Sequence, residues 1–177
     1  MVAGRLAALT DEVAARLSLE DVEAPSCQVG AAVRAVAMDK ATMDDAGLLQ
    51  WTVSALVASY TYDYHDQAVQ VTAARSRFGR AGQEGADGPF GSLIDLSDAA
   101  RERWLCRAQA DEAAALVEKG VILDVLRYDV ELPMVQTCEH GAGDFTSRFR
   151  DRAQMVRTGE LDDPEGVVID RVQVTKR

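Results

Sequence analysis

Residues 48–78 read LLQWTVSALVASYTYDYHDQAVQVTAARSRF, and this stretch of 31 residues contains neither glycine nor proline. Apolar side chains recur at helical spacing along one side of it, from Leu49 through Leu56 and Tyr64 to Phe78. A second apolar group lies nearly opposite on a helical projection and comprises Trp51, Ala55, Ala58, Tyr62 and Val69. At about 1.5 Å per residue the pattern predicts one continuous helix of roughly 46 Å, typical of the centre of a helical bundle or of a subunit interface.

The middle of this stretch, SYTYDYHDQ at 59–67, holds three of the four tyrosines and one of the two histidines. If it is helical, His65 has no metal-ligating neighbour one turn away, and Asp63 points to another side of the helix. Aromatic packing is then expected in place of catalysis or metal binding. The tyrosines also alternate, so a short strand remains an alternative, and it would place Thr61, Asp63 and His65 on one face.

Working outward from the long helix, the sequence predicts an α+β fold that is mainly a helical bundle over about residues 3–119. The remaining expected elements are helices over 3–18, 27–38, 98–119 and 144–157, a glycine-rich loop over 79–91, and strands over 121–132 and 167–174. The two strands are expected to pair with each other, with Pro133 ending or bending the first. We expect a single domain over 1–177, with a helical part over 1–120 and a β-α-β arm over 121–177.

The composition and charge of the chain argue against several classes of function. The chain of 177 residues carries a formal net charge of −10, which argues against general nucleic-acid binding because that needs a positive surface. The longest apolar stretch, 48–60, is too short to span a bilayer, and Asp11 and Glu12 interrupt any signal-peptide pattern near the N-terminus. A cytoplasmic protein without a membrane partner is therefore expected.

The cysteines offer a weaker signal. Cys27, Cys106 and Cys138 are widely spaced and odd in number, which favours reduced thiols. Cys138 and His140 could supply two zinc ligands, with the other cysteines completing the set, but structural zinc sites need four ligands at characteristic spacings. A Cys138–His140 nucleophilic dyad is weaker still. We expect neither metal nor cofactor, and a simple turn at 137–145.

Arginines gather near the C-terminal end at positions 148, 150, 152 and 157, with others at 75, 77 and 80. They could form a basic face that binds a partner, or could be ordinary solvated helix surface. The candidate interface therefore combines the second apolar side of the long helix with two of these arginines: Trp51, Ala55, Ala58, Tyr62, Val69, Arg148 and Arg152.

These features favour a non-enzymatic assembly subunit of a larger, homo-oligomeric complex, whose partners are copies of itself and neighbouring proteins. In outline, a helical bundle with an extended β arm resembles a ring-forming connector or adaptor of a tailed-virus particle, which implies a virion component assembled in the cytoplasm. The alternative is a small cytosolic enzyme or ligand-binding subunit with His65 or Asp66 as acid–base group. Its inter-helix pocket would be lined by Trp51, Tyr62, His65 and Trp104.

Overall fold

The computed structural model describes residues 37–84, 101–159 and 164–177. All of them belong to the second of two compact units, Met1–Arg34 and Ala35–Arg177. The helix predicted over 3–18 lies outside the described residues, as do all but the end of the helix predicted over 27–38 and most of the glycine-rich loop.

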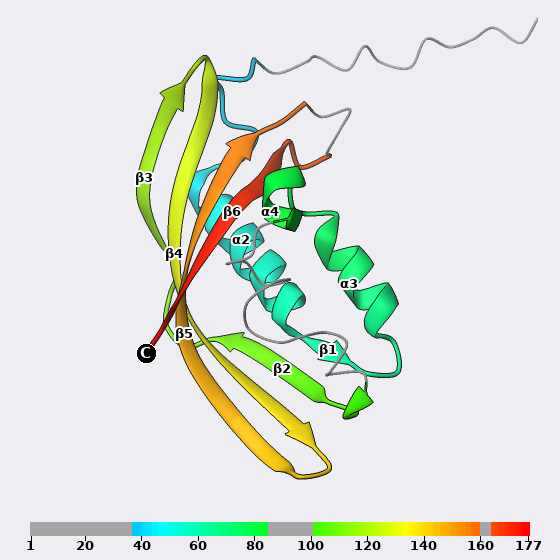
Figure 1. Cartoon of the computed structure of the whole chain (residues 1–177). Coiled ribbons are helices and arrows are strands. Elements are labelled where there is room, and N and C mark those ends of the chain that lie inside the picture. The colour runs from blue at the N-terminus through cyan, green and yellow to red at the C-terminus, as the bar shows by residue number, and fades with distance from the viewer. Residues whose placement is uncertain (1–36, 85–100, 160–163) are drawn as a thin grey trace, which may run out of the picture. The chain divides into compact units, whose positions relative to one another are not determined.

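An antiparallel sheet dominates this unit (Figure 1). In chain order the elements are α2 (Asp45–Tyr60), β1 (Tyr62–Asp63), α3 (Gln67–Arg75), α4 (Arg80–Glu84), β2 (Leu105–Ala110), β3 (Ala115–Ile122), β4 (Val125–His140), β5 (Gly143–Arg157) and β6 (Val167–Lys176). The strand order is β1-β2-β4-β5-β6, and β3 also pairs with β4. The prediction of a mainly helical bundle is therefore wrong.

A long β4–β5 hairpin forms the centre of the sheet. Its register runs from Arg127 opposite Val156 to His140 opposite Gly143. Side chains at every second position of β4 are buried, including Val130 and Leu132, so one face of the hairpin supplies the core. The helix predicted over 144–157 is strand β5 instead. β6 was predicted as a strand, but it pairs with β5 and not with 121–132.

β2 and β3 lie along the same edge of β4, one after the other. Residues 105–110 pair with the far part of β4 and residues 115–122 with its near part. Pro133 sits at the break between them, and its carbonyl accepts a hydrogen bond from the backbone N–H of Asp111 at 2.8 Å. A missing N–H at a ladder break costs no strand pairing, and β4 continues to His140, so Pro133 does not end the strand. The helix predicted over 98–119 is replaced, where it is described, by these two strands.

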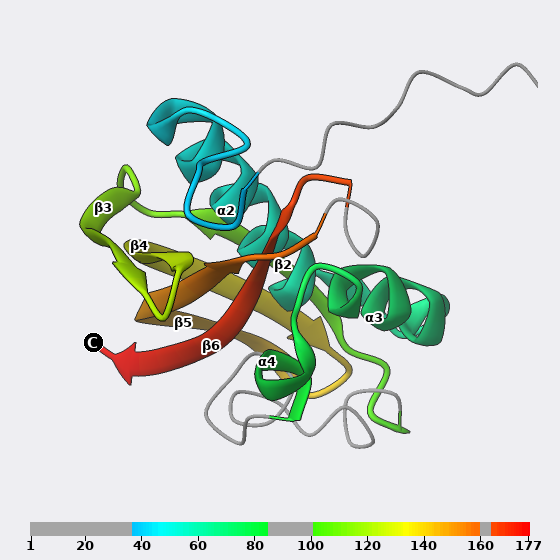
Figure 2. The same ribbon diagram turned by 90° about the horizontal axis from the view of Figure 1, so that it is seen from above.

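α2 packs on the concave face of the sheet (Figures 1 and 2). Its first turn is capped by Asp44, whose Oδ1 accepts from the N–H of Gly47 at 2.7 Å. Its buried side chains recur at helical spacing and include Leu48, Leu56 and Tyr60. They pack against β4, β5 and β6, and this contact makes up the main core.

The predicted long helix is broken at Tyr60. Thr61 adopts an extended conformation, and Tyr62–Asp63 pairs with Cys106 and Leu105 of β2. The chain then turns, and α3 begins at Gln67. The alternative of a short strand is the one that the structure follows, because pairing with β2 outweighs the local helical periodicity.

The segment that precedes α4 closes part of the edge of β6. Ile169 accepts from the N–H of Gly79 at 2.9 Å and donates to the carbonyl of Arg77 at 3.0 Å, which forms a parallel bridge between Phe78 and Ile169. At Gly82 a Cβ would lie 2.5 Å from the carbonyl oxygen of Ile169. Only glycine lets α4 approach the strand this closely.

Candidate functional site

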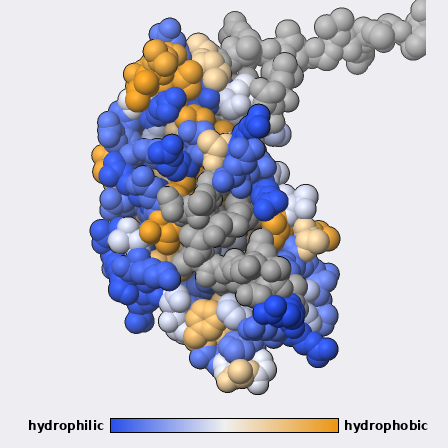
Figure 3. All heavy atoms as spheres, viewed as in Figure 1, coloured by the Kyte–Doolittle hydropathy of each residue, from blue (hydrophilic) through white to orange (hydrophobic). Residues whose placement is uncertain are grey.

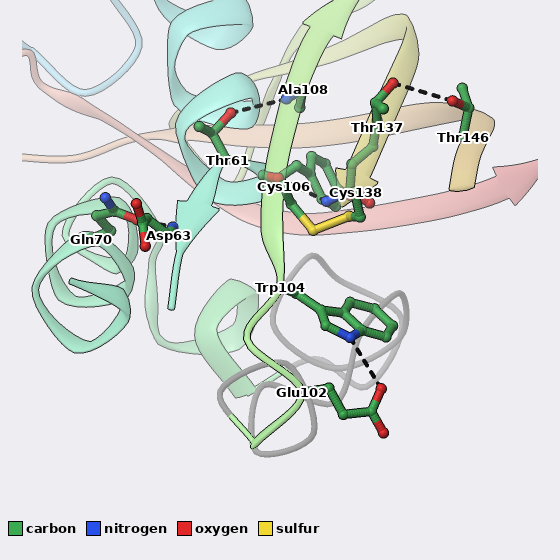
Figure 4. The surroundings of a disulfide bond; sticks show 12 residues. Thr61, Asp63, Gln70, Glu102, Trp104, Cys106, Ala108, Thr137, Cys138 and Thr146 are labelled. Atoms are coloured by element: carbon green, nitrogen blue, oxygen red, sulfur yellow. Dashed lines mark hydrogen bonds between the residues drawn. A yellow bond between two sulfur atoms is a disulfide. The ribbon is translucent and has the colours of Figure 1, made fainter. Parts of the chain in front are cut away.

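A disulfide joins β2 to β4. Cys106 and Cys138 are directly opposite each other in the register, with a Cα–Cα distance of 4.1 Å, and their sulfurs are bonded (Figure 4). Both cysteines are fully buried. The expectation of reduced thiols is therefore wrong for this pair. Cys138 is also not free to serve as a zinc ligand or a nucleophile while this bond is intact.

Aromatic rings surround the disulfide. Tyr62 is buried beside it, and Trp104 and Phe145 pack against the same cluster. Trp104 stacks on His140 with ring centroids 5.2 Å apart, and its Nε1 donates to Glu102 at 3.1 Å. The rings exclude water from one side of the bond. The cluster and the disulfide together stabilise this end of the sheet.

Tyr62 is buried in this cluster together with its hydroxyl group. Its hydroxyl has no hydrogen-bond partner among the described residues. Burial raises its pKa well above the usual range. The hydroxyl is therefore neutral at any physiological pH and contributes desolvation cost without a bond in return.

His65 lies on the exposed turn between β1 and α3. Its Nδ1 is 2.7 Å from Oδ1 of Asp63, which also accepts from the backbone N–H of His65 at 2.9 Å. These hydrogen bonds, the backbone one first, lower the pKa of Asp63. The pair orders the turn at the surface, where the ring of His65 also packs on that of Tyr64 with the ring centroids 3.8 Å apart.

The pocket predicted from Trp51, Tyr62, His65 and Trp104 is not assembled. Tyr62 and Trp104 share the disulfide cluster, Trp51 packs against the main core, and His65 is exposed. Within the described segments, no group of three or more His, Cys, Asp or Glu side chains could hold a metal ion.

The candidate interface residues are dispersed. Ala55 and Tyr62 are buried within the chain, Trp51 and Ala58 are half-buried, and Val69 is 71% exposed on α3. The two arginines lie on β5 and point away from α2, and each faces an acid on a neighbouring segment. Arg148 lies 3.7 Å from Asp111, and Arg152 lies 2.6 Å from Asp129. An interface role for these residues stays a prediction.

One ionisable side chain is buried under α2. Asp151 of β5 is 0% exposed, and its Oδ1 accepts from the hydroxyl of Tyr60 at 3.1 Å. Its Oδ2 has no partner among the residues that the structure describes. Burial raises the pKa of Asp151 to about 7, although the Tyr60 hydrogen bond acts in the opposite direction. Burial, and then the nearby carboxyl, raise the pKa of Tyr60 as well.

The largest exposed apolar side chains cluster at the tip of the β3–β4 hairpin (Figure 3). Val121, Ile122 and Leu123 are 53%, 54% and 89% exposed. Leu123 and Asp124 form the turn with φ values of 52° and 62°. Sequence reasoning missed this tip because the turn lacks the Asn-Gly or Asp-Gly signal of a tight hairpin.

Residues 26–176 match the protein family described as "Type-IV b secretion system, inner-membrane complex component". No curated protein matches the chain in sequence. In the part of the chain that the structure describes, no helix is both long and apolar enough to cross a membrane.

Several solved structures share the fold. The periplasmic domain of DotI is 21% identical with a TM-score of 0.70, over 76% of this chain and 97% of that one. An IcmL-like type IV secretion system protein from Legionella pneumophila is 17% identical with a TM-score of 0.65, over 76% and 94%. CagV, a VirB8 homolog from Helicobacter pylori, is 8% identical with a TM-score of 0.56, over 75% and 99%. The curved sheet with its packed helices is thus the NTF2-like fold of these proteins.

The family match confirms the prediction of a structural subunit in a larger complex. It also overturns three other predictions. A tailed-virus connector is wrong, because the complex is a secretion system. The cytoplasmic location and the absence of a membrane partner are wrong, because the complex belongs to the inner membrane.

Proposed function

Because this chain belongs to the family of type-IV b secretion system inner-membrane complex components, we propose that its unit Ala35–Arg177 is a periplasmic assembly domain of such a complex. In this role the domain binds copies of itself and neighbouring subunits and performs no chemistry. The observation that carries the periplasmic placement is the Cys106–Cys138 disulfide. Disulfides persist in the oxidising periplasm and are rare in a reducing cytosol.

Two further observations support the proposal. The DotI structure that shares this fold is a periplasmic domain, and the match to this chain covers 97% of it. The acidic and basic side chains on the outer face of the sheet are also paired across strands, as in Arg152 with Asp129 and Arg150 with Glu131. Opposite charges cancel within each of these pairs, and specific polar contacts to a neighbouring subunit can form at such positions.

The compartment is tested in cells by reciprocal reporter fusions after Arg177. Alkaline phosphatase, which folds only after export, should be active, and β-galactosidase at the same position should be inactive. Trapping of thiols with a maleimide polymer should show two additional reactive groups after reduction, because the Cys106–Cys138 bond is formed in the cell. An active β-galactosidase fusion, or the same number of thiols before and after reduction, would refute the periplasmic placement.

A further inference from the structure

The β3–β4 hairpin carries an apolar knob at its tip. Val121, Ile122 and Leu123 are all more than half exposed, and Leu123 adopts a left-handed conformation that a leucine rarely takes. Neither property helps an isolated domain in water, where consecutive exposed aliphatic residues invite association. The knob is therefore better explained as a contact surface than as a free loop.

A groove lies beside the knob on the face of the sheet opposite α2. It has a volume of about 300 Å³ and runs across β3, β4 and β5. Gly120 is one of its lining residues, and a Cβ at this position would meet nothing within 4 Å. The register places Gly120 opposite Arg127, and Arg127 opposite Val156, so these three positions share one face of the sheet with Ile122.

The knob and the groove are complementary in chemistry. The aliphatic side chains of Ile122 and Val156 line the groove together with the acids Glu118 and Asp129, and its volume is roughly ten times that of a water molecule. Asp129 is already paired with Arg152. Arg127 at its rim is exposed, as is Asp124 at the turn next to Leu123. For neither side chain does the structure give an ion pair within the described residues. An incoming tip would bring an apolar side chain to Ile122 and Val156, and an acid to Arg127, the one basic side chain among the described residues that line the groove.

We propose that the hairpin tip of one copy of this chain seats in the groove over Gly120 of a second copy, with Asp124 of each facing Arg127 of the other. Leu123 lies three residues from Gly120, about 10 Å along the strand. Two hairpins side by side in opposite directions can thus each fill the other's groove. A two-fold contact of this kind is self-complementary and closed.

This inference rests on the proposed assembly role, and it names the surface through which the copies meet. A second copy fits better than a lipid bilayer, because Asp124 at the apex would enter the bilayer with the knob. A carboxylate is costly to bury in hydrocarbon, whereas at the rim of a protein groove it finds a base.

The test measures self-association of the purified full chain by sedimentation velocity over a range of concentrations. Gly120→Val fills the groove without a clash, and valine suits a strand, so the fold should survive. It should weaken association by at least about tenfold, which corresponds to one lost buried side-chain contact. Ala73→Val, at an exposed position on α3 outside the candidate interface, is the matched control, because it also adds apolar bulk, and it should leave association unchanged.

Exchanging the charges at positions 124 and 127 gives a more specific test. Asp124→Arg and Arg127→Asp should each weaken association about tenfold when alone, because like charges then meet. An equal mixture of the two variants should associate as the wild type does, since every tip then faces a groove of opposite charge. Contacts within one chain cannot produce this rescue.

The outcomes separate this inference from the proposed function. If Gly120→Val associates normally, or the mixture stays unassembled, the surface is refuted while the assembly role stands. If the wild-type chain stays monomeric at every concentration, self-assembly is refuted together with the surface. If Leu123→Asp abolishes flotation with phosphatidylethanolamine–phosphatidylglycerol vesicles and leaves association intact, the knob binds lipid and the inference is wrong.

Discussion

The two halves of the β4–β5 hairpin are stabilised by different means. Under α2, Leu132 and Met134 of β4 are fully buried against the helix, and no cross-link is present between the described residues there. Past the end of α2, the same hairpin carries the small cluster of Tyr62, Cys106 and Cys138. A large core holds the first half by burial. The second half has too few apolar neighbours for that, and a covalent bond supplements them.

The largest expected effect is in the helix-covered half. Leu56→Ala removes a side chain that is 0% exposed, and it should lower the free energy of unfolding by about 3–4 kcal/mol. Urea denaturation followed by circular dichroism measures the loss. Val69→Ala, at an exposed position, should change it by less than about 0.5 kcal/mol. A loss below about 0.5 kcal/mol for Leu56→Ala, the usual limit for an exposed site, would show that α2 is not held by burial.

At the opposite half, removal of the disulfide should cost about 3 kcal/mol. The bond closes a loop with a sequence separation of 32, and opening it restores chain entropy to the unfolded state. The double variant Cys106→Ala/Cys138→Ala and the reduced wild-type chain should lose similar amounts in urea denaturation. Amide exchange should rise mainly near β1 and β2. Equal loosening of α2 would contradict the separation of the two halves.

Between pH 5 and pH 8 the main pH effect should arise from the helix-covered half. The pKa of Asp151 is raised to about 7 in the folded chain, so the folded state holds a proton that the unfolded state has already released. Stability is therefore highest at acidic pH and is lost as pH rises toward 7. Between pH 5 and pH 8 the free energy of unfolding should fall by about 2.5 kcal/mol relative to Asp151→Asn.

The asparagine variant is the control for this pH effect, because its side-chain oxygen can still accept from Tyr60 but cannot ionise. Urea denaturation of both proteins across this pH range measures the difference. Parallel pH profiles for the two proteins would mean that Asp151 ionises in the folded chain as easily as in water.

The smallest effects compare two tyrosine hydroxyls. Tyr60→Phe should destabilise by about 1–2 kcal/mol, because it leaves Asp151 without its hydrogen-bond donor. Tyr62→Phe should be neutral or slightly stabilising, because the Tyr62 hydroxyl is buried without a partner among the described residues. Thermal denaturation of both variants decides the point, and the reverse ranking would be inconsistent with these contacts.

How far the sequence predicts the fold depends on the segment. Alternating side chains predicted β6 and the first half of β4, because their period of two has no helical competitor. The strand predicted over 121–132 runs wrongly through the turn at Leu123 and Asp124, and the turn predicted over 137–145 is mostly strand. β5 was missed although Arg148, Arg150 and Arg152 also alternate, since Phe145, Phe149 and Ala153 happen to fit a four-residue spacing. In such a segment, hydrophobic periodicity alone does not distinguish a helix from a strand.

The break at Tyr60 has a weak local signal, the alternation of the tyrosines, which left a short strand open only as the alternative to a continuous helix. Thr61 and Tyr62 carry no breaker residue, and the extended conformation is fixed by pairing with β2 more than forty residues later, as in the bond from Ala108 N–H to Thr61 at 3.1 Å. The wide spacing of the cysteines likewise led to the wrong prediction of reduced thiols, because Cys106 and Cys138 meet only through the register of β2 and β4. The candidate site depended on both of these long-range pairings.

The bridge between Phe78 and Ile169 has a consequence for the behaviour of the protein in a crowded compartment. An open strand edge is a template for stacking of foreign chains, and it is the usual starting point of amyloid-like growth. Here the chain occupies that stretch of β6 with its own backbone, and Gly82 lets α4 lie against it. This stretch of backbone already has its hydrogen bonds when many copies lie side by side. Contacts between copies are therefore left to side chains.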